Sequence, residues 1–183
     1  AGSAMVALAP FFLFIAIAIR VSSRGPALFK QTRLGHRGVP FEIFKFRTMT
    51  VAENGAEVTQ VQANDRRVTA LGRWLRKASI DELPQLLNVL RGEMSLVGPR
   101  PHAVAHDHHY TKSIDNYDIR QHVKPGITGW AQVNGYRGET ASADLMRRRV
   151  EFDIWYAKNA SIVLDLRILM LTVVEVLRQR NAY

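Results

Sequence analysis

The hydrophobic pattern of the chain begins with an unbroken apolar stretch. Every residue from Ala4 to Ile19 is apolar, and basic side chains follow at Arg20 and Arg24. As a helix the stretch would be about 24 Å long, shorter than a hydrocarbon core of about 30 Å. Pro10 lies near its middle, where a missing N–H and a ring clash kink a helix. We therefore expect a re-entrant helix over 4–19; a buried core helix, a signal-peptide remnant and the end of a spanning helix remain alternatives.

Short alternating segments follow between turn residues. Turns are predicted at Gly25-Pro26 and over 35–40. In the segment 41–47, Phe44 and Phe46 fall on one face, whereas Lys45 and Arg47 share the other. This pattern predicts a small β-hairpin with a basic face.

The middle of the chain alternates between loop and helix patterns. The stretch from Thr50 to Asn64 is polar and lacks periodicity, which predicts a mobile loop that could act as a lid. The next stretch, "TALGRWLRKAS", has a helical pattern that ends at Ser79. Four glycines then crowd into the segment 126–138, which indicates tight turns and close approach of backbones.

Two helices are predicted at the C-terminal end. The first is "ADLMRRRVEFDIWYAKN", and the second is "SIVLDLRILMLTVVEVLRQR". Polar positions interrupt a broad apolar stripe in the second helix, so we expect it to be interfacial or to face the core. The patterns together predict an α+β fold that is mainly helical.

Composition bounds the class of protein. With 183 residues, 47% of them apolar, the chain suits one globular domain, 1–183, and it contains no internal repeat. It has no cysteine, which excludes disulfides and thiolate metal sites. A net charge of +9 predicts attraction to nucleic acid, an anionic membrane face or phosphorylated small molecules. No nucleic-acid-binding motif is recognisable, so we expect no nucleic acid partner.

The segment "SIDELPQLLNVLRGEMSLVGPRP" places two carboxylates, Asp81 and Glu82, before a run of leucines. Two helix starts are possible. Ser79 and Glu82 could form a capping box, or Pro84 could occupy the first helical position and leave the pair in the preceding turn. Both options put the pair at a helix N-terminus, held by leucines at spacings of three and four residues.

The acid pair has a structural and a chemical interpretation. Acidic residues in a first turn commonly do no more than complement the helix dipole. However, five cations lie in the flanking segments, namely Lys45, Arg47, Arg76, Arg91 and Arg100. For phosphoryl chemistry one ionised carboxylate could attack phosphorus and the second could hold Mg²⁺. Arg100, between two prolines, could meet phosphate oxygens or could be a solvated turn residue.

Several motifs in one order resemble the monotopic polyprenyl-phosphate phosphoglycosyl transferases of bacteria. They are the Pro-interrupted apolar helix, "GPALFKQTRLG", "FEIFKFRTM", "SIDELPQLLNVLRGEMSLVGPRP", "VKPGITGWAQVNG" and "EFDIWYAKNASIVLDLRILMLT". Members of this family move a sugar phosphate from a UDP-sugar to a polyprenyl phosphate, usually undecaprenyl phosphate. "NGYRGET" and the terminal "NAY" look more like the branch with large N-terminal membrane regions, which often starts polysaccharide assembly with glucose or galactose phosphate. This predicts a catalytic domain truncated at its N-terminus.

The resemblance implies a mechanism and a location. Asp81 would be the nucleophile that forms an aspartyl phosphosugar and releases UMP, Glu82 would bind Mg²⁺, and Lys45, Arg100 and Asp153 would belong to the site. Arg137 would be a further candidate for contact with the nucleotide sugar. The site would lie at the cytoplasmic face of the bacterial inner membrane, among lipids, with a homodimer possible. Near cations, Asp81 should stay ionised.

One segment departs from the family pattern. "HAVAHDHH" contains His102, His106, His108 and His109, which allows a transition-metal site, a solvated loop or a pH-sensitive lid. Two rival functions also remain. One is a basic membrane-surface module without catalysis, in which the acids are helix caps, and the other is direct transfer in a ternary complex with Asp81 as a general base.

Overall fold

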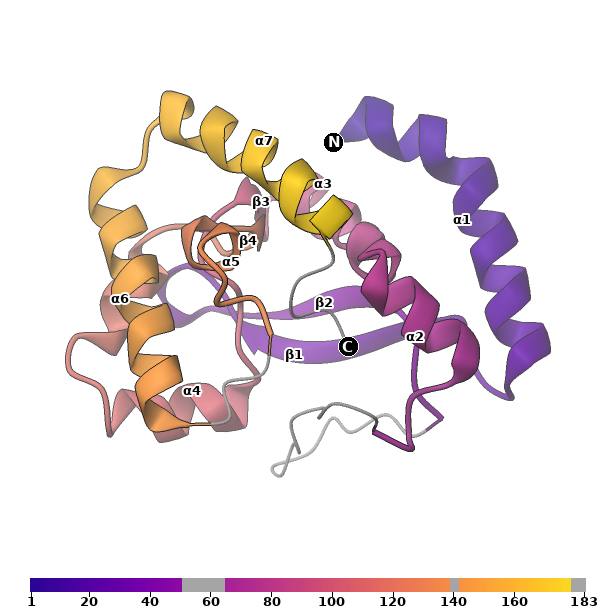
Figure 1. Ribbon diagram of the computed structural model, residues 1–183, viewed down its shortest axis with the longest axis horizontal. Coiled ribbons are helices and arrows are strands. Elements are labelled where there is room, and N and C mark those ends of the chain that lie inside the picture. The colour runs from indigo at the N-terminus through magenta and orange to yellow at the C-terminus, as the bar shows by residue number, and fades with distance from the viewer. Residues whose placement is uncertain (51–64, 139–141, 179–183) are drawn as a thin grey trace.

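The structure is a computed structural model that describes residues 1–50, 65–138 and 142–178. The first part contains, in order, α1 (Gly2–Ser22), β1 (Leu28–Leu34), η1 (His36–Gly38), β2 (Pro40–Phe46), α2 (Ala70–Lys77), η2 (Ile80–Gln85) and α3 (Leu86–Leu90). The second part contains β3 (Ser95–Val97), α4 (Val104–Thr111), η3 (Tyr117–His122), β4 (Gly126–Thr128), α5 (Trp130–Val133), α6 (Ala143–Asn159) and α7 (Ile162–Arg178). The elements labelled η are 3-10 helices. The mainly helical α+β fold is confirmed (Figure 1). The predicted lid, Thr50–Asn64, lies almost wholly outside the described residues.

The predicted hairpin is present, and η2, α3 and α4 pack against it. Strands β1 and β2 pair antiparallel, with Leu28 opposite Phe46 and Leu34 opposite Pro40. The connecting turn contains Arg37 in the left-handed region, at φ 57°. The hairpin therefore presents a continuous strand, β2, against which the acid-bearing segment η2 packs.

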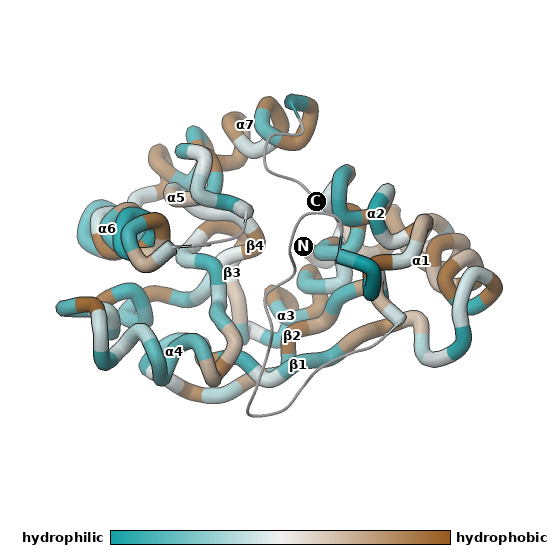
Figure 2. The backbone as a smooth tube through the Cα atoms, turned by 60° about the horizontal axis from the view of Figure 1, so that its bottom comes forward, coloured by the Kyte–Doolittle hydropathy of each residue, from teal (hydrophilic) through white to brown (hydrophobic). Residues whose placement is uncertain are grey.

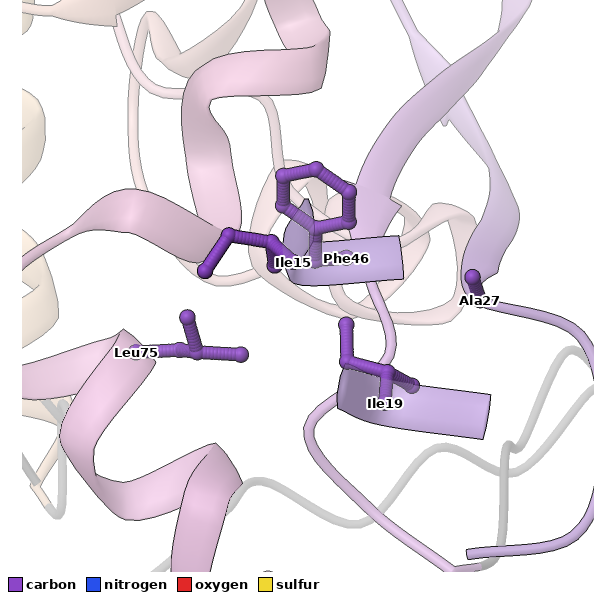
Figure 3. Packing of buried hydrophobic residues seen from close by; sticks show 5 residues of the cluster. All are labelled: Ile15, Ile19, Ala27, Phe46 and Leu75. Carbon is purple, nitrogen blue, oxygen red and sulfur yellow. The ribbon is translucent and has the colours of Figure 1, made fainter. Parts of the chain in front are cut away.

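Helix α1 is attached to the body of the protein by its C-terminal half. Ile15 and Ile19 are buried against Phe46, Leu75 and Ala27, so α1 packs on both β2 and α2 (Figure 3). Because these side chains are nearly inaccessible to water, their burial stabilises the contact by roughly 1.5 to 3 kcal/mol for each large aliphatic residue.

Arg47 also fixes the end of α1, which corrects the prediction of an open basic face. Its guanidinium donates hydrogen bonds to the carbonyl oxygens of Ser23 (2.7 Å) and Arg24. The last carbonyls of a helix have no partner within the helix and carry its negative dipole end, so a buried arginine both satisfies and neutralises them. Arg47 is therefore part of the α1 attachment rather than a free cation.

The N-terminal end of α1 also approaches α3, at Gly2 and Leu90, but much of the helix is exposed. Among the described residues, α1 is long and apolar enough to cross a membrane, and only 11% of its most apolar window is buried in the protein. Large apolar side chains such as Val6, Phe14 and Val21 are exposed, and Figure 2 shows the helix as a largely hydrophobic segment at one edge. The helix has 21 residues, about 31 Å, so the short length predicted from 4–19 was wrong. Pro10 lies inside this continuous helix.

The segment around the acid pair is pinned to the hairpin by one buried amide. Asn88, in α3, accepts a hydrogen bond from the Phe44 backbone N–H at 3.1 Å and donates one to the Glu42 carbonyl oxygen at 2.7 Å. Asn88 is fully buried, whereas Leu90 is half exposed. The predicted leucine stripe is therefore only part of the buried face, and a polar side chain makes the specific link to β2.

A second, parallel sheet lies on the other side of the acid pair. Strands β3 and β4 pair Ser95 with Gly126 and Val97 with Thr128. A Cβ atom at Gly126 would lie 2.1 Å from the Gly98 nitrogen, so the two backbones approach as closely as the glycine content predicted. The Gly126 N–H also donates a hydrogen bond to the Pro99 carbonyl oxygen at 2.9 Å. The close pairing of β3 and β4 therefore fixes the Pro-Arg-Pro turn that follows β3.

Both predicted C-terminal helices are present. Helix α6 has the predicted bounds, and α7 is described from Ile162 to Arg178. On α7, Ile168 is fully buried, whereas Met170, Val173 and Leu177 are among its exposed apolar residues. The helix therefore combines a core-facing side with an exposed apolar side, and Figure 2 shows it at the edge of the protein.

Candidate active site

The acid pair lies in the 3-10 helix η2 rather than at the start of a regular α-helix. Ser79, the residue before η2, is in the left-handed region at φ 59° and makes no side-chain capping bond. The predicted capping box is therefore wrong, and Pro84 lies within η2, not at its first position. Asp81 and Glu82 are nevertheless in the first turn, as predicted, and both are buried, with 8% and 7% of their surface exposed.

Glu82 is held between two cations. Lys45 Nζ, from β2, lies 2.9 Å from Glu82 Oε1, and Arg100 Nη1 lies 3.0 Å from Glu82 Oε2. Arg100 Nη2 also donates to Oε1, which makes the pairing bidentate. Burial opposes ionisation of Glu82, but Arg100 and Lys45 outweigh it and hold the pKa well below its usual range. Glu82 is thus a permanent anion at working pH.

Asp81 has the opposite environment. No described residue donates a hydrogen bond to its carboxylate. Burial, followed by the negative charge of Glu82, raises the pKa of Asp81 to about 6, although Lys45, Arg76 and Arg100 oppose the rise. The carboxylate is therefore mostly ionised at pH 7, as expected, but it is more basic than an ordinary aspartate. Unpaired, poorly hydrated oxygens of this kind are well suited to act as a nucleophile or a base.

Two of the five flanking cations have other roles. Arg47 binds the end of α1, and the Arg91 guanidinium lies 4.8 Å from the centre of the Phe44 ring. Lys45 and Arg100 contact the acid pair directly. Burial lowers the pKa of Arg76, an effect that the charges of Asp81 and Glu82 oppose, so this arginine completes the local positive charge.

Two other arginines hold the backbone of the turn that carries Arg100. Arg120 Nη2 donates a hydrogen bond to the Arg100 carbonyl oxygen, and Arg33 donates one to the carbonyl oxygen of Pro101 at 3.2 Å. Asp153 binds Arg120 at 2.9 Å and 3.1 Å. Asp153 was predicted to belong to the site; the structure places it one layer behind, paired with Arg120 rather than with Asp81, Glu82 or Lys45.

The layer behind Arg100 contains residues that the sequence analysis missed. Tyr117 donates a hydrogen bond to Asp107 Oδ1, His102 Nδ1 lies 2.6 Å from the Tyr117 hydroxyl, and Arg120 contacts all three residues. Burial, then the positive charge of Arg120, places the pKa of His102 well below its usual range, so this histidine is neutral. Neither "YDIRQH" nor "HAVAHDHH" carried a sequence signal for this network.

The structure bears on the three alternatives for the histidine segment, the first of which was a transition-metal site. The described residues contain no group of three or more His, Cys, Asp or Glu side chains placed to hold a metal ion. His106, His108 and His109 lie in α4, which excludes a solvated loop at this position. His102 precedes the helix and is buried.

Arg137 lies on the other side of η2. Its guanidinium donates a hydrogen bond to the Ser79 hydroxyl, and burial lowers the pKa of Arg137. The charges of Glu82 and Asp81 act on Arg137 as well, so it is within electrostatic range of the acid pair. It shares a pocket of about 260 Å³ with Glu82.

The structure thus combines a buried acid pair, surrounded by lysine and arginine, with an exposed apolar helix, α1. A family model described as bacterial sugar transferase matches residues 1–179. The chain belongs to the bacterial sugar transferase family.

Curated relatives agree with this assignment. Over 179 residues the chain is 50% identical to "UDP-glucose:undecaprenyl-phosphate glucose-1-phosphate transferase" of Escherichia coli (strain K12), covering 98% of this chain and 39% of the relative. A protein of the same name from Caulobacter vibrioides is 55% identical over 175 residues, covering 96% of this chain and 66% of the relative. "UDP-N-acetylgalactosamine-undecaprenyl-phosphate N-acetylgalactosaminephosphotransferase" of Aeromonas hydrophila is 43% identical over 166 residues, covering 90% of this chain and 38% of the relative. The chain thus spans about two fifths to two thirds of the length of these relatives.

Proposed function

We propose that the chain transfers a sugar 1-phosphate from a UDP-sugar to undecaprenyl phosphate, with Asp81 as the nucleophile. The observation that carries the proposal is the contrast within the acid pair: Glu82 is bound by two cations, whereas the buried Asp81 carboxylate has no hydrogen-bond donor among the described residues. The names of the relatives supply the substrate class, and those with 50% and 55% identity favour glucose over an N-acetylated sugar. Such a reaction would begin the membrane stage of polysaccharide assembly.

In the first half-reaction, an Asp81 carboxylate oxygen attacks the phosphorus that carries the sugar. A new O–P bond forms, the bond from this phosphorus to the bridging oxygen breaks, and the electron pair leaves with UMP. Lys45, Arg76 and Arg100 surround the pair with positive charge that would offset the repulsion between a carboxylate and a diphosphate. The raised pKa of Asp81 makes the carboxylate a better nucleophile while leaving it ionised near pH 7.

In the second half-reaction, a phosphate oxygen of undecaprenyl phosphate attacks the same phosphorus. The bond to Asp81 breaks, and its electron pair restores the carboxylate. The two phosphate substrates would use the same cations in turn, because the reacting phosphorus stays on Asp81 between the steps. The limited exposure of Asp81 would slow hydrolysis of this intermediate by water.

Glu82 was predicted to bind Mg²⁺, and the free oxygen valences of the acid pair support this part of the proposal. Glu82 Oε1 accepts from two cationic groups, but Oε2 accepts from one and keeps a free lone pair. Asp81 supplies a second carboxylate, and Mg²⁺ typically uses one or two carboxylates together with substrate phosphates and water. Glu82 and Asp81 would hold the ion. The positive charge of Mg²⁺ would neutralise part of the negative charge of the diphosphate.

The exposed apolar faces of α1 and α7 support a membrane location for this chemistry. Phe14 and Val21 on α1, and Met170 and Leu177 on α7, offer apolar surface that suits lipid. We place the site at the cytoplasmic face of the bacterial inner membrane, with α1 re-entering it near Pro10. Because the chain lacks cysteine, Ser3→Cys and Ser23→Cys variants can test this: labelling of both from the same side of a vesicle supports re-entry, and labelling from opposite sides contradicts it. A single catalytic domain and a homodimer remain predictions.

The test of the reaction is a trapping experiment. The protein in detergent is incubated with Mg²⁺ and UDP-glucose that carries ³²P in the phosphate next to the sugar, without acceptor. We expect label on the denatured protein at Asp81, with release of an equal amount of UMP. Asp81→Asn should abolish both and lower turnover at least about 1,000-fold, whereas Asp115→Asn, at an exposed aspartate, should change neither.

The same experiment separates the rival functions. Turnover with acceptor but no label at Asp81 without it would indicate direct transfer in a ternary complex. Failure to release UMP from any UDP-sugar, together with normal vesicle binding by Asp81→Asn, would indicate a membrane-surface module without catalysis.

A further inference from the structure

A pocket of about 260 Å³ lies between η2 and α7; Glu82 lines it, whereas Asp81 and Lys45 do not. Apolar atoms make up most of the surface that the pocket presents, although seven of its thirteen lining residues are polar or charged. Besides Ala78, Ser79 and Glu82, the lining includes Ile80, Leu83, Ile127, Thr128, Gln132, Val133, Arg137, Thr172, Glu175 and Val176. Such a lining favours an apolar ligand, because each buried methylene group contributes about 0.8 kcal/mol.

The charged groups of the pocket are few and are largely paired. Glu82 is bound by Lys45 and Arg100, and Glu175 lies 3.5 Å from Arg178. Arg137 donates to the neutral Ser79 hydroxyl, and no carboxylate of residues 1–50, 65–138 or 142–178 lies within hydrogen-bond distance of its guanidinium. The end of the pocket at Ser79, Glu82 and Arg137 can therefore receive an anionic head group.

The pocket is poorly suited to the nucleotide sugar. Pockets for drug-sized molecules are about 300 to 1,000 Å³, and a UDP-sugar is large and polar throughout. The volume and the largely apolar surface of this pocket suit a short length of hydrocarbon instead.

Helix α7 connects the pocket with the apolar outer surface. Thr172 and Val176, four residues apart on one face, line the pocket. Val173 and Leu177, each the next residue along, are exposed. A hydrocarbon chain leaving the pocket past Val176 would therefore meet the apolar side chains of Val173 and Leu177, beside the paired charges of Glu175 and Arg178.

We propose that this pocket binds the isoprene units next to the phosphate of the polyprenyl phosphate acceptor, with that phosphate at the Glu82–Arg137 end. The inference rests on the proposed function and adds the route by which the acceptor reaches Asp81. The lipid enters along α7. Its phosphate oxygen, which accepts the phosphosugar, then lies beside η2. The donor and the acceptor then share the cations but not this pocket.

Filling the pocket tests the proposal through the two half-reactions. Val176 is partly exposed, so Val176→Trp can place its ring in the pocket, and Val173→Trp is a matched control on the exposed face of the same helix. We expect Val176→Trp to form the labelled Asp81 intermediate and release UMP at a normal rate, but to transfer the label to undecaprenyl phosphate at least about 10-fold more slowly. Val173→Trp should do both normally.

A binding measurement makes the test independent of turnover. Because the chain lacks cysteine, Val176→Cys and Val173→Cys each provide one thiol for reaction with a maleimide in detergent. We expect undecaprenyl phosphate to protect the thiol in Val176→Cys, with little effect in Val173→Cys and little protection by UDP-glucose or UMP.

The outcomes separate the two proposals. Protection of the Val176→Cys thiol by UDP-glucose but not by the lipid, or a Val176→Trp variant with a slow first step and a normal second step, would overturn the acceptor assignment while leaving the Asp81 chemistry intact. Normal rates of both steps in a folded Val176→Trp variant would also overturn it. Absence of the labelled intermediate in the unmodified protein would instead reject the proposed function itself.

Discussion

Asp153 and Arg120 form a fully buried ion pair, with Asp153 Oδ2 2.9 Å from Arg120 Nη2. The same Arg120 nitrogen donates to the Arg100 carbonyl oxygen. Asp153 is therefore linked to the acid pair through Arg120 and the turn that carries Arg100. This relationship gives Asp153 a positioning role, which differs from direct contact with substrate.

The first prediction concerns this relay. Arg120→Met should lower kcat/KM for the UDP-sugar at least about 10-fold, because the Arg100 turn loses its anchor. Asp153→Asn, which keeps an oxygen acceptor for Arg120, should lose less than Asp153→Leu. The measurement is a double-mutant cycle with Arg100→Gln. If Arg120 acts through Arg100, the two losses will be strongly non-additive; additive losses would contradict the relay. Thermal unfolding of each variant checks the folded fraction.

The second prediction is that Asp81→Asn stabilises the protein at neutral and higher pH. The folded pKa of about 6 lies above the ordinary value of 3.8, so the folded state holds this proton more tightly than the unfolded state does. The stability from this proton is complete below about pH 4 and is lost as the pH rises through 6. Asp81→Asn should therefore raise the free energy of unfolding on the order of 2 kcal/mol at pH 8 and by little at pH 4.

Chemical denaturation at a series of pH values measures this effect. If Asp81→Asn has an unchanged or lower free energy of unfolding at pH 8, the ionised Asp81 carboxylate does not destabilise the folded state, and the prediction is wrong. Asp115→Asn, at an exposed position, supplies the baseline.

The third prediction has the opposite sign at the adjacent residue. Glu82→Gln should lower the free energy of unfolding at pH 7 by about 3 to 5 kcal/mol, because Lys45 and Arg100 would be left largely buried without an anion. The folded pKa of Glu82 is lowered. Its contribution is therefore present above the ordinary value of 4.5 and is lost as the pH falls through the folded pKa, so the loss in Glu82→Gln should shrink in acid. Glu151→Gln, at an exposed i,i+3 pair, should have almost no effect at any pH.

The fourth prediction concerns the link between α3 and the hairpin. Asn88→Leu keeps the side-chain volume but leaves the Phe44 N–H and the Glu42 carbonyl without their partner. Each unsatisfied buried group costs about 1 to 3 kcal/mol, so we expect a loss of at least about 2 kcal/mol in the free energy of unfolding. Asn134→Leu, which removes an exposed bond to the Trp130 carbonyl, is the control. Equal stability of the two variants would show that Asn88 does not pin η2 and α3 to β2.

The sequence predicted the elements that local patterns encode. Alternation over 41–47 gave the hairpin, and helical periodicity gave α6 with its correct bounds. Both predicted helix starts put Asp81 and Glu82 at a helix N-terminus, where the structure has them, although neither start was correct in detail. Charge near the pair also pointed to Lys45 and Arg100, which contact Glu82.

The remaining errors involve contacts between distant residues. No local rule places Arg47 on the end of α1 or Arg120 between Asp153 and Arg100, because these pairs are separated by at least 20 residues. The capping box failed because the Ser79 hydroxyl accepts from Arg137, 58 residues away. In each case the tertiary partner decided the role of a polar side chain whose local pattern allowed several roles.

The packing of Ile15 and Ile19 on Phe46 and Leu75 also determines where Asp81 lies relative to α1. If a flexible linker joined the domain to its membrane anchor, the distance between the active site and the bilayer would vary. Here the proposed anchor packs directly on the scaffold of Asp81, so on the proposed orientation the depth of the reaction is set by side chains in that contact. Substitutions at Leu75, which is buried in that contact, would then shift the working depth of the enzyme and the lipids from which it can draw its acceptor.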